Sequence, residues 1–258
     1  MFYIPLFQDI PKMLIECWAD CKNIIIIGDH QTFKFESTAP LDMIKNVTLV
    51  TEKFAPMQKL LEQADTMLNA SSDLLIVVGF YREFAQNVIN GRYTILEPKM
   101  PDKKEMFNLL TMYKNKWARM HPRLTVIITI PQVVDFYKYN TVNNPDIQKS
   151  QEFTDDMNKF SHQFSINIMS FYKEIRPSLT MGSRRLWLYH MTNSLYENHQ
   201  NLLPTLGDFN VRPQFPPNST HDGFKPNQAT SLRMRAELVA YVTKLFQKNS
   251  VPQYDTDN

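Results

Sequence analysis

The amino-acid sequence predicts an α/β fold, a three-layer α/β/α sandwich with a central, mostly parallel sheet of five strands. Five short runs are apolar at nearly every position, which is typical of strands buried on both faces of a sheet. Longer stretches with apolar residues at helical spacing separate these runs. Because parallel strands need a crossover connection, usually a helix, this alternation predicts helices on both faces of a parallel sheet.

The strands are predicted from apolar runs that end at turn-forming residues. The first run has four isoleucines before Gly28, and the third, DLLIVVGF, contains Gly79 near its end. The fourth run, TVIITIP, stops at a proline, which cannot donate a hydrogen bond within a sheet. The predicted strands cover residues 23–28, 47–50, 73–80, 125–131 and 185–190.

The helices are predicted from residues spaced three and four apart. Leu60, Leu61 and Ala64 share one face of the second helix, and Met106 and Tyr113 share a face of the third. The last helix would bury a stripe made of Leu232, Ala236, Val239, Val242 and Phe246. The predicted helices cover residues 10–20, 56–68, 103–119, 153–175 and 232–246.

The chain is expected to form one domain over 1–247, followed by a flexible tail over 248–258. A length of 258 residues fits a single large α/β domain. The proline-rich stretch over 191–229 shows little periodicity and predicts a long surface connection.

Composition excludes several classes of function. Lys and Arg number 28 against 26 Asp and Glu, so a nucleic-acid surface would require segregation of charge. Cys17 and Cys21 lack the further Cys or His of a zinc site, and no motif indicates a cofactor. No apolar run is long enough for a membrane span. Two cysteines and the lack of a signal-peptide pattern favour a cytoplasmic location.

Polar motifs stand where three of the predicted elements meet loops. Gly28-Asp29-His30 follows the first strand, and Gly79-Phe80-Tyr81-Arg82 follows the third. Asp222-Gly223-Phe224-Lys225 comes before the last helix. Ligands of open parallel sheets bind beyond the carboxyl ends of the strands, so these motifs mark the predicted site.

In order and position these motifs resemble those of the SGNH (GDSL) hydrolase family, over roughly residues 23–246. That family has Gly-Asp-Ser after the first strand for the nucleophile, and Gly-x-Asn-Asp after the third for an oxyanion-binding Asn. It has Asp-x-x-His before the last helix for the base and the residue that orients it. The resemblance implies the same fold.

The reacting residues of that family are replaced in this chain. His30 stands at the nucleophile position, Tyr81 at the oxyanion Asn and Lys225 at the base, and only Asp222 is retained. The glycine expected after the second strand is absent from TEKFAP. Acyl transfer needs a nucleophile, a base and oxyanion donors, so we expect a pseudo-hydrolase with no small-molecule substrate. An alternative is an active esterase with a displaced nucleophile, Thr32 or Ser37, assisted by His30 or His221.

Four stretches resemble more narrowly the OSK-type domains of insect germ-plasm proteins. These are MLIECWADCKN, LLIVVGFYREF, MYKNKWARMHP and IPQVVDFYKYNTVNNPD. The resemblance implies a non-catalytic domain that binds mRNA, in single-stranded regions such as 3′ untranslated regions. It also implies germ-plasm protein partners and a place in cytoplasmic germ-plasm ribonucleoprotein granules. A purely protein-binding scaffold domain is the other alternative.

Cations around the degenerate site predict the RNA surface, because Lys and Arg contact phosphates. Arg235 falls within the buried stripe of the last helix, where it would pair with Asp222 or Asp29 or contact a phosphate. Unpaired bases would stack on Tyr81 or a neighbouring aromatic residue. The end of the third helix, from Lys114 to Arg123, is the next candidate surface. The predicted RNA-binding residues are Arg82, Arg184, Arg185, Lys225, Arg233 and Arg235, with Lys34 and Lys45 as outer contributors.

Overall fold

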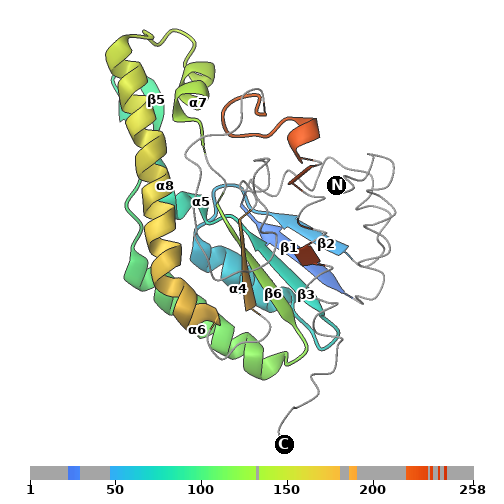
Figure 1. Ribbon diagram of the computed structural model, residues 1–258. Helices are drawn as coiled ribbons and strands as arrows, with labels where there is room; N and C mark the ends of the chain where they lie inside the picture. Colours follow the sequence, from blue (N-terminus) through green and yellow to red (C-terminus); the bar gives the residue numbers. More distant parts are fainter. Residues whose placement is uncertain are drawn as a thin grey trace, which may run out of the picture.

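A computed structural model of the protein confirms the predicted parallel sheet of five strands. The strands are β1 (Ile24–Gly28), β2 (Val47–Thr51), β3 (Leu74–Val78), β6 (Thr125–Ile130) and β7 (Leu186–His190), in the order β2-β1-β3-β6-β7 (Figure 1). All neighbouring pairs are parallel. The structure describes residues 23–29, 47–131, 134–180, 186–190, 219–231, 233–234, 238 and 241–242.

The three central strands are buried along their whole length, as their continuous apolar sequences predict. The third strand is shorter than the predicted range of 73–80. It ends at Val78 because Gly79 and Phe80 both have positive φ angles, 112° and 73°, which take the chain out of the extended conformation.

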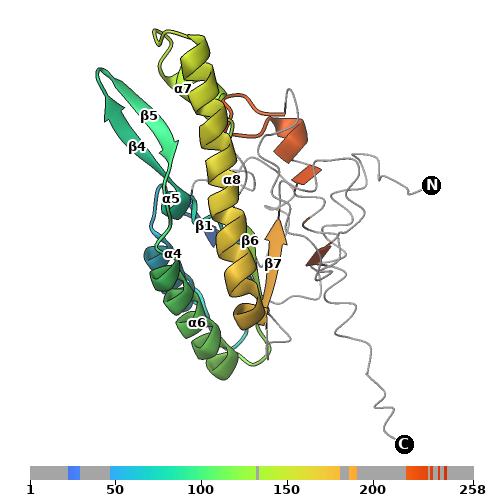
Figure 2. The same ribbon diagram turned by 60° about the vertical axis from the view of Figure 1, so that its left-hand side comes forward.

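Three helices cover one face of this sheet, namely α4 (Met57–Met67), α6 (Lys103–Met120) and α8 (Gln151–Thr180) (Figure 2). They correspond to the predicted helices over 56–68, 103–119 and 153–175, and α8 is longer than predicted at both ends. Described parts of the last helix lie on the opposite face. There the ring of Tyr241 lies 4.7 Å from that of Tyr189 on β7.

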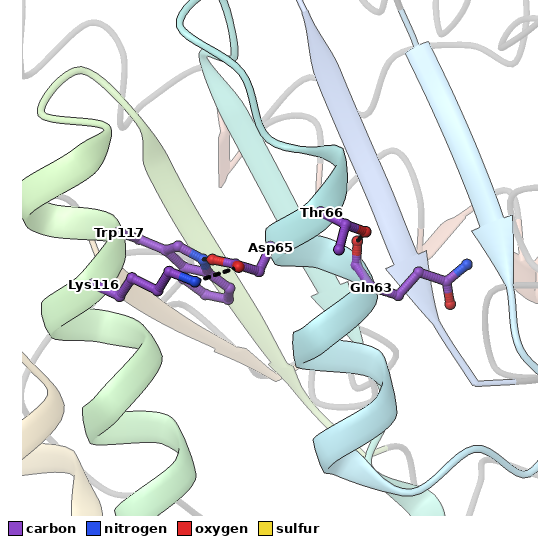
Figure 3. Close-up of polar contacts among 5 residues, drawn as sticks. All are labelled: Gln63, Asp65, Thr66, Lys116 and Trp117. Carbon is purple, nitrogen blue, oxygen red and sulfur yellow. Dashed lines mark hydrogen bonds and ion pairs between the residues drawn. The ribbon is translucent and has the colours of Figure 1, made fainter.

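A single carboxylate joins α4 to α6 (Figure 3). Asp65 on α4 accepts hydrogen bonds from the Lys116 ammonium at 2.6 Å and from the Trp117 indole at 3.0 Å. Because α6 presents both donors from consecutive residues, the carboxylate receives one bond on each oxygen. This contact fixes the packing of the two helices.

A hairpin and two short helices between the third strand and α8 were not predicted from the sequence. The hairpin consists of β4 (Ala85–Asn90) and β5 (Tyr93–Pro98), and the helices are α5 (Tyr81–Phe84) and α7 (Phe136–Asn143). Gly91, with φ of 61°, begins the two-residue turn of the hairpin. A glycine at the first position of a two-residue turn is typical of a type II′ hairpin, so Gly91-Arg92 is the signal that would have identified it.

The Asn140 side chain of α7 hydrogen-bonds to the backbone of β5, as a neighbouring strand would. The Asn140 side chain is fully buried. Its oxygen accepts from the Leu96 N–H at 2.7 Å, and its nitrogen donates to the Leu96 carbonyl at 2.9 Å. Both backbone groups of Leu96 are thereby satisfied, so α7 covers the edge of β5. Figure 2 shows the hairpin, α7 and the first turns of α8 together at one end of the molecule.

The start of the last helix and its approach differ from the prediction. The helix begins at 228 rather than 232, because the Asn227 side chain caps it by accepting from the Thr230 N–H at 2.9 Å. Its described buried face includes Met234 and Leu238 together with the predicted Val242.

The end of the predicted surface connection is packed in part, although His221 and Lys225 are exposed. Ser219, Thr220 and Phe224 are all buried. The predicted helix over 10–20 and the predicted tail over 248–258 lie outside the described residues.

Candidate functional site

Two of the three predicted motifs meet at the carboxyl ends of the strands through Asp29. The Asp29 side chain is fully buried at the end of β1. Its main-chain N–H donates to the Val78 carbonyl at 3.2 Å, and its carboxylate accepts from the Tyr81 N–H at 2.8 Å. Gly79 leaves the space that the carboxylate fills, because a Cβ at this position would overlap with Asp29. Asp29 therefore fixes the loop that follows β3.

Tyr81, at the position of the family's oxyanion-binding Asn, points into the core. Only 2% of its surface is exposed. Its ring lies 4.9 Å from that of Phe224 and 5.9 Å from that of Phe164. Burial raises the pKa of Tyr81 well above its usual value, with smaller contributions from Tyr139 and Asp29, so the phenol stays neutral. The expectation that bases stack on Tyr81 is wrong, because its ring packs between other aromatic side chains.

Asp222 stabilises a turn of its own segment. Its carboxylate accepts from the Phe224 N–H at 3.0 Å and from the Lys225 N–H at 2.6 Å, which is the pattern of an Asx turn. The turn directs Phe224 inward, where 1% of its surface is exposed, while Lys225 is exposed. Asp222 thus has a structural role in the loop before the last helix.

Contacts with α7 hold this loop at the end of the sheet. The Gly223 carbonyl accepts from the Asp135 N–H at 2.8 Å, and the Lys138 ammonium donates to the Thr220 carbonyl at 2.7 Å. Figure 1 shows the segment in red above the strands, on the same side as α7. The 4.9 Å contact between Tyr81 and Phe224 brings it against the loop after β3. The two predicted motifs are therefore adjacent.

Aromatic rings fill the space between these two motifs. Tyr139 lies 6.2 Å from Phe224, and the Phe164 ring lies 5.5 Å from that of Phe136. This cluster could not be predicted from the sequence, because its members come from elements that are far apart along the chain, namely α5, α7, α8 and the loop before the last helix. We call Tyr81, Phe136, Tyr139, Phe164 and Phe224 the aromatic cluster.

Three of the predicted RNA-binding cations are described, and all three are exposed. They are Arg82, Lys225 and Arg233. The Arg82 guanidinium donates to the Phe54 carbonyl at 3.0 Å, and among the described residues its other N–H groups have no hydrogen-bond acceptor. The remaining predicted cations, Lys34, Lys45, Arg184, Arg185 and Arg235, lie outside the described residues, as do His30, Thr32 and Ser37.

Two cations of the alternative surface at the end of α6 contact neighbouring helices. The Lys114 ammonium donates to the Ser178 carbonyl of α8 at 2.7 Å, and burial lowers the pKa of Lys114. Lys116 pairs with Asp65. Two of its cations thus hold α6 against α8 and α4.

The residues that the structure describes offer neither a metal site nor a membrane-spanning helix. Within them no group of three or more His, Cys, Asp or Glu side chains is arranged to hold a metal ion. No helix among them has the length and apolar character needed to cross a membrane.

Comparisons with known proteins show the fold. No protein-family model matches the chain, and no curated protein matches it. Among solved structures, a candidate platelet activating factor from Streptococcus pneumonia is 14% identical, with a TM-score of 0.51 over 92% of this chain and 94% of that one. A candidate lipase from Chitinophaga pinensis is 12% identical, with a TM-score of 0.43 over 88% of this chain and 98% of that one. Phospholipase A1 from Streptomyces albidoflavus is 9% identical, with a TM-score of 0.39 over 87% of this chain and 99% of that one. The protein has an SGNH-hydrolase-like α/β fold.

Proposed function

We propose that the protein is a non-catalytic, SGNH-like RNA-binding domain. It binds single-stranded regions of mRNA, such as 3′ untranslated regions, and scaffolds germ-plasm ribonucleoprotein assembly with protein partners in cytoplasmic granules. The four sequence stretches that resemble the OSK domain of the insect germ-plasm protein Oskar point to RNA and to germ plasm. The burial of Tyr81 in the aromatic cluster supports the non-catalytic part of the proposal, because the family keeps an oxyanion-binding Asn at this position.

Three side chains at the family's reacting positions support the loss of catalysis. An oxyanion hole needs donors aimed at the reacting oxygen, whereas the Tyr81 side chain is buried among rings. Asp222 accepts two main-chain N–H groups of its own turn, and the residue three positions later is Lys225 instead of the histidine that the family's aspartate orients. Lys225 is an exposed cation at the position of the family's histidine.

The exposed cations support binding of a polyanion near the same end of the sheet. Arg82 directly follows Tyr81, and Lys225 directly follows Phe224, so the 4.9 Å ring contact places α5, which carries Arg82, next to the loop that carries Lys225. Arg233 is exposed on the helix that begins three residues after Lys225. Phosphates of one RNA strand would contact these groups in succession.

Reversing two of these charges, with Lys225→Glu and Arg233→Glu combined, is expected to weaken RNA binding at least tenfold. Each lost phosphate contact should lower the slope of log K against log salt by about 0.7 for a single strand. Fluorescence anisotropy with a labelled single-stranded RNA at several salt concentrations measures both quantities. Both side chains are exposed, so the fold should be retained.

The control for this variant is Lys104→Glu with Lys149→Glu, which changes the net charge equally at two exposed lysines, one on α6 and one just before α8. If the folded site variant bound RNA with the parent's affinity and salt slope, this surface would not be the RNA site. If the parent itself bound no RNA while retaining protein partners, the purely protein-binding alternative would replace the proposal.

An active esterase is the second candidate, since the three motifs stand in the order and positions of those of the SGNH hydrolase family. We expect the purified protein to hydrolyse p-nitrophenyl acetate and longer esters no faster than the background from surface nucleophiles. Initial rates with the parent and with the Thr32→Ala and Ser37→Ala variants check this expectation. Turnover above background that either substitution abolished would establish a displaced nucleophile instead.

A further inference from the structure

A groove of about 360 Å³ lies beside Arg82, between the loop after β2 and the base of the β4–β5 hairpin. Its floor is formed by buried residues, Tyr81, Ala85 and Leu96, and its rim by longer side chains. The volume is in the range of small-molecule sites, which combine an apolar floor with a few polar groups. The rim residues are Phe54, Arg82, Gln86, Asn87 and Lys99.

Phe54 has two unusual properties on this rim. It has a φ angle of 54°, a left-handed conformation that is costly for an aromatic residue, and 44% of its surface is exposed. Strained residues of this kind persist where the surroundings hold them, and they concentrate at ligand-binding sites. The Arg82 guanidinium donates to the Phe54 carbonyl at 3.0 Å and so helps to stabilise this backbone conformation.

The polar rim presents more donors than acceptors. Lys99 is anchored through its backbone, whose N–H donates to the Phe84 carbonyl at 2.7 Å and whose carbonyl accepts from Asn167 at 3.0 Å. Within the described residues its ammonium has no salt bridge, and neither does the Arg82 guanidinium.

The neighbouring carboxylates already have hydrogen-bond donors. Glu83 accepts from the Met57 N–H at 2.9 Å, and Glu97 accepts from the Gln86 amide at 3.0 Å. The groove thus combines an exposed ring, an apolar floor and two cations.

We propose that this groove binds one unpaired nucleotide of a single-stranded RNA, with its base against the Phe54 ring and its phosphate between Arg82 and Lys99. The inference rests on the proposed function, and it moves the stacking residue from Tyr81 to Phe54. Every base has a face that stacks on an aromatic ring, so the subsite tolerates different sequences. Lys99 and Arg82 supply the phosphate contacts that a stacked base by itself lacks.

The test compares two substitutions at Phe54 by fluorescence anisotropy with labelled 12-nucleotide oligo(U) and oligo(A). Phe54→Gly removes the ring and accepts the positive φ angle, so we expect binding to weaken about 5- to 150-fold, as for the loss of one stacked base. The salt slope should stay unchanged, because no phosphate contact is lost. Phe54→Trp keeps a ring in the groove and should bind within about threefold of the parent.

A strand without bases separates stacking from charge. Phe54→Gly should bind an abasic 12-unit strand as the parent does, whereas Lys99→Glu should weaken both kinds of strand and lower the salt slope by about 0.7. Lys104→Glu, at an exposed lysine on α6, is the matched charge control. Thermal unfolding checks the fold of every variant, and Phe54→Asn, which also tolerates a left-handed backbone, replaces Phe54→Gly if that variant does not fold.

The outcomes distinguish this subsite from RNA binding as a whole. If Phe54→Gly or Phe54→Asn bound oligo(U) and oligo(A) as tightly as the parent does, the subsite would be wrong while the proposed function stood. An equal loss of affinity for the abasic strand would also overturn it, since the ring would then act without a base. If the parent bound neither RNA, the proposed function and the subsite would fall together.

Discussion

Replacing Gly79 by alanine is expected to lower the free energy of unfolding by more than about 4 kcal/mol, enough to prevent stable folding. Gly79 has a φ angle of 112°, which residues with a Cβ rarely adopt. An added Cβ would also overlap with the Asp29 carboxyl group, which is fully buried. Moving the Asp29 carboxylate away would break its hydrogen bond from the Tyr81 N–H. Urea unfolding followed by circular dichroism measures the effect.

Gly91→Ala is the matched control for this substitution. Gly91 also has a positive φ angle, 61°, but no atom lies within 4 Å of an added Cβ. Its replacement should therefore cost only about 1 kcal/mol, from the backbone conformation alone. Comparable losses at the two glycines would show that the contact with Asp29 contributes nothing. A second check is Asp29→Ala in the Gly79→Ala background, which should recover part of the loss by removing the overlap.

Asn140→Leu is expected to lower the free energy of unfolding by about 3 kcal/mol. Leucine has nearly the same size, but it cannot accept from the Leu96 N–H or donate to the Leu96 carbonyl. Both backbone groups would remain in the core without a partner, and an unsatisfied buried group costs about 1–3 kcal/mol. Urea unfolding gives the total effect, and hydrogen exchange of the Leu96 amide shows whether the contact between α7 and the hairpin has opened.

Asn143→Leu provides the comparison on the same helix. The Asn143 side chain is exposed and donates only to the Tyr139 carbonyl, one turn earlier. Its replacement should change the free energy of unfolding by no more than about 0.5 kcal/mol. If Asn140→Leu were equally mild and the Leu96 amide stayed protected, the hairpin would be held by apolar packing rather than by this side chain.

The hairpin and the start of the last helix were not predicted from the hydrophobic pattern of this chain. Apolar runs identified all five strands of the sheet. The three central strands are buried on both faces and are therefore apolar at nearly every position, whereas the edge strand β2 is only half-buried and includes the exposed Thr48. The hairpin lies outside that sheet, and most residues of its two strands are exposed or half-buried. A search for continuous apolar runs therefore did not identify it. The cap formed by Asn227 set the start of the last helix four residues before the apolar stripe began.

The sequence by itself determined the α/β class, the parallel sheet and the places of the three motifs, because these depend on residue type and spacing along the chain. Only the tertiary structure decided where their side chains point. Tyr81 is buried because Phe164 and Phe224 meet it from distant elements. Asp222 closes a turn, and the Phe54 ring stands at the rim of a groove. Exposure depends on which segments pack together, and spacing along one segment carries no information about its partners.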